Sequence, residues 1–420
     1  MKVLVLGSGG REHALCWKLA QSPLLSQLFC CPGNAGIAQI ATCISGDAVE
    51  VAQQIGADFM VVGPDGLLAE GVVDKLNAAG IRAFGPTQQA AQLESSKIFC
   101  KDLLRKYGIP TARAETFDSP EEAKIYLSDL DDDSPIVVKA DGLAVGKGVV
   151  VAQSKADARA AVDEVLNIAH ATSGDNNRVL VEEYMTGEEV SLMALTDGET
   201  VLPLVASQDH KRIGEGDTGA NTGGMGCYSP VPAFTQEMFN DAVENILKPT
   251  LAGLKAEGIE YRGVLYAGLM LTPQGTKVVE FNARFGDPET QVVLPRLKSD
   301  LLPLLLACSG ANEYSIEDLE CEWTPEAAVC VVMSSEGYPG NYHKGDVISG
   351  LEEATQNGAL IFHAGTAQKD DEIVTSGGRV LGISALGNGF HEARAKCYNA
   401  VEKIGFDGAY HRKDIGWRCL

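Results

Sequence analysis

Near residue 280 the sequence carries a carboxylate and an amide whose types and spacing suit a magnesium site. The segment VVEFNARFGD alternates apolar and polar residues, so Glu280 and Asn282 should project to one face of a strand, with Arg284 next in that row. Oxygen ligands from one carboxylate and one amide, completed by phosphate and water, suit Mg²⁺, which seldom takes an all-protein cage. The alternative is a polar stripe on a half-exposed strand, and it accounts for Arg284 better than for the other two residues.

A second group of residues has the composition of a phosphate-binding turn. In VVKADGLAVGKGVVV, Lys139 stands at a strand end, Gly142, Gly146 and Gly148 follow in a hairpin loop, and Lys147 lies at its tip. Glycines let backbone N–H groups fold over phosphate oxygens, and lysines supply point charges. The spacing is not that of the G-x-x-x-x-G-K-[ST] loop. Taken alone, the segment fits an ordinary glycine-rich hairpin equally well.

The segment VEEYMTGEEVS places residues 182–185 at the end of an apolar strand. An extended hinge of this kind offers backbone N–H and C=O groups to an adenine edge, and a nearby carboxylate such as Glu189 can accept ribose hydroxyls. A solvated acidic turn is the alternative, and in isolation this segment fits it better.

A long polar stretch, DHKRIGEGDTGANTGGMGCYSP, interrupts the strand pattern between residues 209 and 230. Its Asp209, Asp217 and Asn221 could bind an amine or a hydroxylated sugar. A polar segment of this length is either functional or disordered, and composition does not choose between the two.

The opening VLVLGSGGREHAL predicts a buried strand, a glycine turn and a helix. A dinucleotide fingerprint needs a third glycine where this chain has Glu12, and the second strand ends in CCPGN without the expected acidic residue. A helix N-terminus with Arg11 beside it still suits a single phosphate. A turn needed only for packing remains the alternative.

Several elements must position these residues. The first ~95 residues alternate apolar runs with helix-like segments, which predicts a parallel, doubly wound sheet. A helix capped by serine is expected from about residue 94 until Gly108 and Pro110. Strand pairs around a helix at 155–169 follow, and beyond Ala327 we expect a small separate mixed unit.

Composition excludes some classes of partner. The formal charge of 34 − 57 = −23 repels polyanions, which argues against nucleic-acid and anionic-membrane partners. No stretch approaches the ~20 apolar residues of a membrane span, and the N-terminus has no separate apolar region with a cleavage site. The 11 cysteines lack metal-like spacing, so we expect small buried thiols and a cytoplasmic protein.

Taken in order, these segments resemble the ATP-grasp ligases, and among them the glycinamide ribonucleotide synthetase family. The phrases that carry the resemblance run through nearly the whole chain, from GSGGREHAL, PGNAG and GPDGLLAEG to VVKADGLAVGKGVVVA and VVEFNARFGDPETQ. The resemblance implies an ATP-grasp fold of the α/β and α+β classes. We expect an N-terminal Rossmann-like domain over 1–95, an ATP-grasp domain over 96–326 with a lid at about 112–187, and a small mixed α/β domain over 327–420.

The resemblance also implies roles for single residues. By position, Lys97 and Lys139 match ATP-phosphate lysines. For ATP, the matches are the mobile loop over the phosphates at Gly146, Lys147 and Gly148, the adenine hinge at Glu182, Glu183, Tyr184 and Met185, and the ribose carboxylate Glu189. The metal ligands are Glu280 and Asn282. The catalytic and substrate-cleft residues are Asp217, Asn221 and Arg284, and the sugar-phosphate residues are Gly9, Gly10 and Arg11.

The implied reaction joins glycine to 5-phosphoribosylamine with ATP and Mg²⁺ or Mn²⁺, through glycyl phosphate, in purine synthesis. The implied partners are these small molecules, with the chain acting as a monomer or a weak homodimer. Two alternatives remain. One is another ATP-grasp ligase or carboxylase, and the other is a nucleotide-binding protein without catalysis, which would need neither a metal row nor a long substrate loop.

Overall fold

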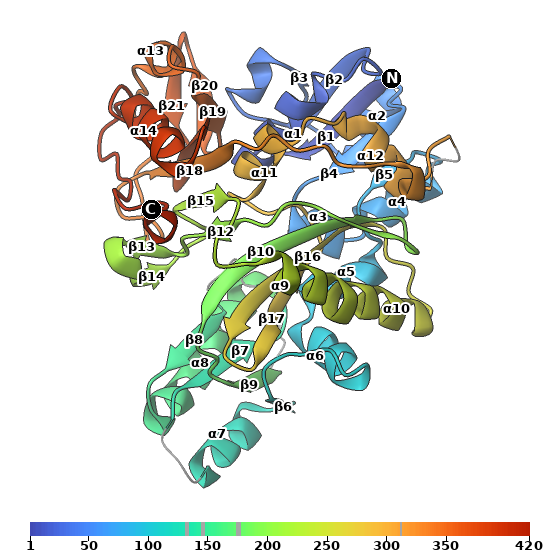
Figure 1. Ribbon diagram of the computed structural model, residues 1–420, viewed down its shortest axis with the longest axis vertical. Helices are drawn as coiled ribbons and strands as arrows, with labels where there is room; N and C mark the ends of the chain where they lie inside the picture. Colours follow the sequence, from blue (N-terminus) through green and yellow to red (C-terminus); the bar gives the residue numbers. More distant parts are fainter. Residues whose placement is uncertain (131–133, 144–147, 174–177, 311–312) are drawn as a thin grey trace.

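The N-terminal part of the computed structural model is a five-stranded parallel sheet in the order β3-β2-β1-β4-β5 (Figure 1). The structure describes residues 1–130, 134–143, 148–173, 178–310 and 313–420. The predicted doubly wound sheet is confirmed. Its strands are β1 (Lys2–Gly7), β2 (Gln27–Pro32), β3 (Thr42–Cys43), β4 (Phe59–Val62) and β5 (Ala83–Phe84), and its helices are α1 (Gly10–Leu19), α2 (Ala48–Ile55), α3 (Asp65–Ala69), α4 (Val72–Ala78) and α5 (Gln88–Ser95).

The glycine turn after β1 is closed by a carboxylate of the chain itself. The Glu12 side chain accepts a hydrogen bond from the Gly9 N–H at 2.6 Å, which is one half of a capping box, because glycine has no side chain to make the other half. The Arg11 guanidinium pairs with the same carboxylate at 2.5 Å. Glu12 therefore occupies the anion position that this helix N-terminus offers.

A four-stranded antiparallel sheet lies at the opposite end of the molecule, in the order β6-β9-β7-β8 (Figure 1). The serine-capped helix α6 (Lys97–Lys106) begins at Ser96, as predicted, and leads into it. The sheet consists of β6 (Ala114–Phe117), β7 (Ile136–Ala140), β8 (Val149–Ala152) and β9 (Val179–Glu183), with helices α7 (Pro120–Asp129) and α8 (Lys155–Ser173).

A second four-stranded antiparallel sheet, β11-β10-β16-β17, occupies the middle of the chain. The two strands expected around residues 179–196 do not pair with each other: β9 joins the first sheet and β10 the second. The segment between them therefore crosses from one sheet to the other. The sheet contains β10 (Glu188–Thr196), β11 (Val201–Pro203), β16 (Gly263–Thr272) and β17 (Gly275–Asn282), and α9 (Gln236–Ala242), a π-helical turn (Val243–Leu247) and α10 (Lys248–Ala256) lie nearby in the chain.

A β-bulge in β17 decides which side chains of that strand leave the core. Val278 pairs with Leu269 and Glu280 with the adjacent Gly268, so Val279 is the extra residue. Before the bulge Val278 is buried, and after it Phe281 is buried. Because one extra residue reverses the alternation, Glu280 and Asn282 lie on the open face instead of in the core.

The C-terminal sheet is shared between two stretches of the chain. Its order is β12-β15-β18-β22-β19, so strands from the polar 209–230 region pair with strands that follow Ala327. The unit after Ala327 is thus joined to the preceding one by a continuous ladder. The strands are β12 (Gln208–Asp209), β15 (Gly226–Ser229), β18 (Ala327–Ser334), β19 (Leu360–His363) and β22 (Arg379–Gly387).

The remaining elements connect or cover these sheets. Within the described ranges, no helix has the length and apolarity needed to cross a membrane. All 11 cysteines are free, and eight of them are buried as expected, whereas Cys43, Cys321 and Cys419 are partly exposed. The elements are hairpins β13 (Arg212–Gly214) with β14 (Thr218–Asn221) and β20 (Thr366–Lys369) with β21 (Glu372–Thr375), helices α11 (Thr290–Arg296), α12 (Leu301–Cys308), α13 (Leu351–Thr355) and α14 (Phe390–Val401), and 3-10 turns Ile37–Gln39, Glu215–Asp217, Ile316–Asp318 and Trp417–Cys419.

Two buried histidines join the N-terminal and C-terminal parts, and they make stability depend on pH. The backbone N–H of His363 donates a hydrogen bond to His13 Nδ1 at 2.8 Å. Burial, and after it the charge of His363, lower the pKa of His13 to about 3. In the unfolded chain His13 has the ordinary histidine pKa of ~6.5, so it takes up a proton when the pH falls below that value. Between these two values the unfolded state binds more protons, so the free energy of unfolding falls as pH falls, by at most about 1.4 kcal/mol per pH unit.

We expect this slope to be shallower in His13→Gln, whose amide oxygen can still accept the bond. Denaturant midpoints measured from pH 7 to pH 4 give the slope for each protein. Equal slopes in the two proteins would contradict the assignment, whatever their difference in stability at pH 7.

Candidate active site

A buried carboxylate fixes the lysine at the end of β7. Glu182 of β9 pairs with Lys139 and with Lys101 of α6, each at 2.6 Å, and all three side chains are buried. Burial opposes the charged form of Glu182, but Lys139 and Lys101 outweigh it and lower the pKa of the carboxyl group. The Glu182 side chain is thus committed to the two lysines, and only its backbone is open to a ligand.

Two lysines from different elements approach Glu280. Burial opposes the charged form of Lys139, but Glu182 and Glu280 outweigh it and raise its pKa. Burial lowers the pKa of Lys97, although Glu280 acts in the opposite direction. Lys97 Nζ donates to the Gly142 carbonyl at 2.6 Å, beside the predicted phosphate loop. Gly146 and Lys147 of that loop lie outside the described residues, whereas the Gly148 carbonyl accepts a β7–β8 bond from Ala140.

The acidic and amide pair of β17 stands on the partly exposed face of that strand. The Glu280 side chain is 43% exposed, and Lys211, Lys139 and Lys97 outweigh burial and lower its pKa. Asn282 Oδ1 accepts from Arg284 at 3.1 Å. An ionised carboxylate and an amide oxygen that share an open face suit a hard cation which keeps water and phosphate ligands, so the donor set fits Mg²⁺. Within the described residues no cluster of three acidic, histidine or cysteine ligands competes with this site.

Three residues that the sequence analysis did not identify support this cluster, namely Lys211, Glu94 and Lys101. Lys211 pairs with Glu189 at 2.5 Å and lies 3.9 Å from Glu280, so it links the predicted ribose carboxylate to the metal pair. Arg284 pairs with Glu94 of α5 at 2.9 Å. Lys101 holds Glu182, as described above. Only the alternation of charge with apolar residues signalled these positions, and that signal does not say which residues meet.

The predicted hinge lies between the two antiparallel sheets. Tyr184 and Met185 follow β9 and precede β10, outside both ladders, and Tyr184 is 45% exposed. Glu183 anchors the start of the hinge because it accepts from the Arg113 backbone N–H and guanidinium. The backbone groups of the hinge are therefore presented at the edge of the cleft.

A carboxylate of the polar segment has a buried oxygen without a hydrogen-bond partner. Asp209 Oδ1 is excluded from solvent and has no hydrogen-bond partner. Burial, and then the neighbouring Glu289, raise the pKa of Asp209 well above its usual range. Lys211 and Arg379 act in the opposite direction and lower the pKa of Asp209, but they do not outweigh burial and Glu289. A buried acceptor without a donor marks a place where a cationic ligand would be stabilised.

Asp217 lies where the β13–β14 hairpin contacts the C-terminal segment of the chain. It accepts hydrogen bonds from Arg412 and Arg418 of the C-terminal segment, and His210 lowers its pKa together with these arginines. Asp217 therefore holds the β13–β14 hairpin to the end of the chain and is not brought to Glu280. The polar segment is an ordered part of two sheets, so the alternative of disorder is wrong for its described residues.

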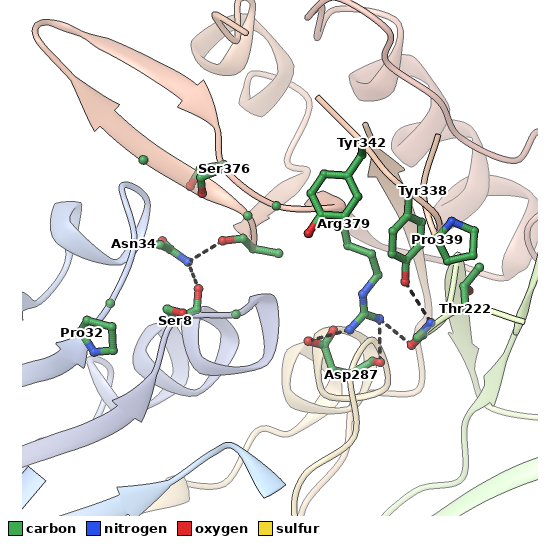
Figure 2. A pocket seen from close by; sticks show the side chains of 18 of the residues that line it. Ser8, Pro32, Asn34, Thr222, Asp287, Tyr338, Pro339, Tyr342, Ser376 and Arg379 are labelled. Carbon is green, nitrogen blue, oxygen red and sulfur yellow. Dashed lines mark hydrogen bonds and ion pairs between the residues drawn. The ribbon is translucent and has the colours of Figure 1, made fainter. Parts of the chain in front are cut away.

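A cavity of about 700 Å³ lies where the N-terminal part, the polar segment and the C-terminal part meet (Figure 2). Gly9 and Asn221 line it, whereas Gly10 and Arg11 do not. Arg11 is buried and donates to the Phe285 carbonyl as well as to Glu12. A Cβ on Gly10 would lie 2.7 Å from Gln291 Nε2, so this glycine permits α1 to pack on α11.

Arg379 is the permanent cation among the described residues that line this cavity, and sequence reasoning missed it. It donates to the carbonyls of Gly223 and Asp287 and pairs with the Asp287 carboxylate at 3.2 Å (Figure 2). Asn34 enters from the opposite side, where it donates to the Ser8 carbonyl (Figure 2). Asp209 lies near enough to both sites for Lys211 of the Glu280 cluster and Arg379 of the cavity to act on its pKa.

Two antiparallel sheets with converging lysines, a crossing hinge between them and a carboxylate–amide pair on the open strand face define an ATP-grasp enzyme. Family models agree over most of the chain: the phosphoribosylglycinamide synthetase N domain matches residues 1–94, its ATP-grasp (A) domain 95–290 and its C domain 328–418. The chain belongs to the phosphoribosylglycinamide synthetase family.

Relatives are similar over the full length. The chain is 48% identical to a phosphoribosylamine–glycine ligase of Agrobacterium fabrum and 49% identical to one of Escherichia coli, covering 100% of this chain and 99% of each relative. The crystal structure of a phosphoribosylamine–glycine ligase from Thermotoga maritima matches with a TM-score of 0.85 and 36% identity over 99% of this chain and 100% of that one. A biotin carboxylase domain from Hydrogenobacter thermophilus, in complex with MgADP and bicarbonate, shares the fold at 18% identity, a TM-score of 0.72 and coverage of 98% and 91%.

Proposed function

We propose that this chain joins glycine to 5-phosphoribosylamine at the expense of ATP, giving glycinamide ribonucleotide, ADP and phosphate. Membership of the family over the full length supports this reaction. The observation that carries it is a series of neighbouring charged groups: Glu280 lies 3.9 Å from Lys211, Lys211 and Arg379 both act on the buried Asp209, and Arg379 lines the large cavity. A nucleotide, an amino acid and a sugar phosphate need these three environments side by side.

The division of labour along the chain follows from this arrangement. We assign sugar-phosphate binding mainly to residues 1–95 and 327–420, and ATP binding to 96–326, with the lid at about 112–187. Location in the cytoplasm and action as a monomer or weak homodimer remain predictions. Sedimentation of the pure chain over a concentration range tests the second of these.

For the nucleotide, Lys97 and Lys139 would neutralise phosphate oxygens, with the loop Gly146, Lys147 and Gly148 closing over them. The backbone of residues 182–185 would meet the adenine edge. Glu189 would accept the ribose hydroxyls once the nucleotide competes for its contact with Lys211. The role of Gly146 and Lys147 stays a sequence prediction, because both lie outside the described residues.

Glu280 and Asn282 would hold Mg²⁺. When bound, this ion supplies charge neutralisation and orientation for phosphoryl transfer. The chain's own residues position the reactants: Lys139 is held by Glu182, and Arg284 is held by Glu94 next to Asn282. The carboxylate of glycine attacks the γ-phosphate, and ADP leaves as glycyl phosphate forms. No nucleophile of the enzyme is required.

The second step joins the two substrates. The amine of phosphoribosylamine attacks the activated carbonyl carbon, and phosphate is expelled. Holding both reactants in adjacent pockets replaces a bimolecular encounter. Closure of the cleft excludes water, which would otherwise hydrolyse the acyl phosphate.

Asp209 suits the glycine ammonium better than Asp217 does. Asp217 is already neutralised by two arginines, whereas Asp209 has a buried oxygen without a donor. Gly224 lies against that oxygen, since a Cβ there would be 3.0 Å away. A bound ammonium would supply the positive charge that lets Asp209 ionise.

We expect Asp209→Asn to raise the KM for glycine about 10- to 100-fold, because a charge-assisted bond of about 1.5–3 kcal/mol is lost. The KM for ATP should change little. Initial rates of ADP release at varied glycine concentration measure both constants.

Asp217→Asn is the matched control. It should lower the melting temperature, because Arg412 is fully buried and loses a charged partner, yet leave the KM for glycine within about twofold. A large glycine effect in Asp217→Asn with none in Asp209→Asn would reverse the assignment.

For 5-phosphoribosylamine we assign the large cavity, with Arg379 and Asn34 near the phosphate or ribose. Gly9 contributes to the cavity wall, while Gly10 and Arg11 shape the turn from behind. The phosphate role first expected for Gly9, Gly10 and Arg11 is thus reassigned in this proposal, because Glu12 already satisfies the turn.

The decisive experiment measures ADP release with glycine, phosphoribosylamine and bicarbonate, added singly and together. Rapid release that needs glycine and phosphoribosylamine together supports the proposal. Stimulation by bicarbonate in place of glycine would favour a carboxylase, the second candidate that the shared fold allows.

A further inference from the structure

A second cavity, of about 280 Å³, lies away from the proposed reaction site and shares no lining residue with the large cavity. Its walls are apolar and include Leu204, Phe234, Phe239 and Trp323. Among the described residues that line it, Arg296 carries the only formal charge. An apolar cavity with a single cationic group has the composition of a small-molecule binding site.

Arg296, the last residue of α11, is buried with an incomplete set of partners. Arg296 as a whole is only 6% exposed to solvent. Nη1 donates to Ser229 Oγ at 2.7 Å and Nη2 to the Thr324 carbonyl at 3.3 Å, and both acceptors are neutral. Nε is buried and has no partner. The guanidinium therefore retains hydrogen-bonding capacity and its full charge.

Other enclosed arginines of this chain have carboxylate partners. Arg412 pairs with Asp217 and Asp414, Arg284 with Glu94, and Arg11 with Glu12. In the described part of the chain no carboxylate pairs with Arg296, and burial alone lowers its pKa. Removing a charge from water without a counter-charge is costly, so buried charges are normally paired.

We propose that this cavity binds a small organic monocarboxylate with an apolar ring or short chain. The carboxylate would pair with Arg296, since a guanidinium matches carboxylate geometry. The apolar body would lie against Phe234, Phe239 and Trp323. The volume is too small for a nucleotide, and apolar walls disfavour a strongly hydrated inorganic anion. This site is independent of the reaction assigned above.

Binding of 4-fluorobenzoate to the full chain, followed by fluorine NMR, tests the proposal. Its neutral isostere 4-fluorobenzamide is the matched ligand control. We expect saturable binding of the carboxylate at least about tenfold tighter than that of the amide. Arg296→Met, which keeps the length of the side chain, should remove this preference.

A rim residue provides variants that do not disturb the core. Gln236 is exposed at the start of α9 and lines the cavity. Gln236→Glu should weaken binding of 4-fluorobenzoate and Gln236→Lys should strengthen it, each about threefold, with binding of the amide and the rate of ADP release unchanged. If Arg296→Met does not fold, these two variants decide the question.

Three outcomes would overturn the proposal. They are the absence of saturable binding, equal affinity for the acid and the amide, and complete displacement of 4-fluorobenzoate by chloride at equal concentration. The last result would identify an inorganic anion site instead.

Discussion

Glu280→Gln should lower the rate of ATP turnover roughly 10³-fold while the protein remains folded. The amide keeps the size of the side chain but removes the negative charge that faces Lys97, Lys139 and Lys211. Mg²⁺ binds an anionic carboxylate oxygen more tightly than a neutral amide oxygen, and the charge removed here is the only carboxylate of the proposed pair, so saturating Mg²⁺ should not restore the rate. Steady-state ADP release across a Mg²⁺ titration measures the effect.

Circular dichroism and the melting temperature of Glu280→Gln establish that it is folded. Glu372→Gln, an exposed carboxylate of the β20–β21 hairpin, is the control for charge loss alone and should behave like the parent chain. Near-normal, Mg²⁺-dependent turnover by folded Glu280→Gln would refute the metal assignment.

The second large effect concerns the lysine pair around Glu182. Lys139→Met should reduce ATP turnover roughly 10²- to 10³-fold, because Lys139 is the member of the pair that also faces Glu280. It should also lower the free energy of unfolding by about 1–3 kcal/mol, since a buried carboxylate loses one of its two partners.

Lys101→Met is the matched variant. It removes the other partner of Glu182 at the same 2.6 Å, but its remaining bonds go to Thr111 and the Ala112 carbonyl, away from the open cleft. We expect a similar loss of stability with a much smaller loss of turnover. Equal losses of turnover in the two variants would mean that Lys139 acts only by supporting the fold.

Local pattern was sufficient to predict much of the fold. The alternation of strands and helices over the first 95 residues gave the parallel sheet, and Ser96 marked the start of α6. Both signals depend on neighbours a few residues apart. The same is true of the β16–β17 turn, where two strands flank a short polar connection.

Long-range partners could not be predicted in this way. Asp217 lies 195 residues from Arg412, and nothing in the periodicity of either segment indicates that they meet. The unpartnered oxygen of Asp209 is likewise a property of the assembled cleft. The polar segment offered both Asp209 and Asp217 to an amine, and the family resemblance pointed to Asp217. Only the surroundings of the two carboxylates in the folded chain favour Asp209.

The glycine turn is an intermediate case. Its composition correctly indicated a helix N-terminus, and a glutamate three residues after Gly9 supplies the half of a capping box that does not need an N-cap side chain. In the sequence, Glu12 only argues against a dinucleotide fingerprint. That its side chain fills the turn is seen in the structure alone. This carboxylate already stabilises the helix dipole, and on that ground we propose that the substrate phosphate binds elsewhere.

The ladder between β15 and β18 has a practical consequence for dissecting this chain. A fragment ending at residue 326 would keep β12 and β15 but lose the strand against which β15 pairs, and a fragment starting at 327 would expose the matching edge of β18. Exposed apolar edges of this kind associate with one another. Each part expressed alone should therefore aggregate. To divide the chain into two polypeptides, both parts should be co-expressed so that β15 and β18 can pair.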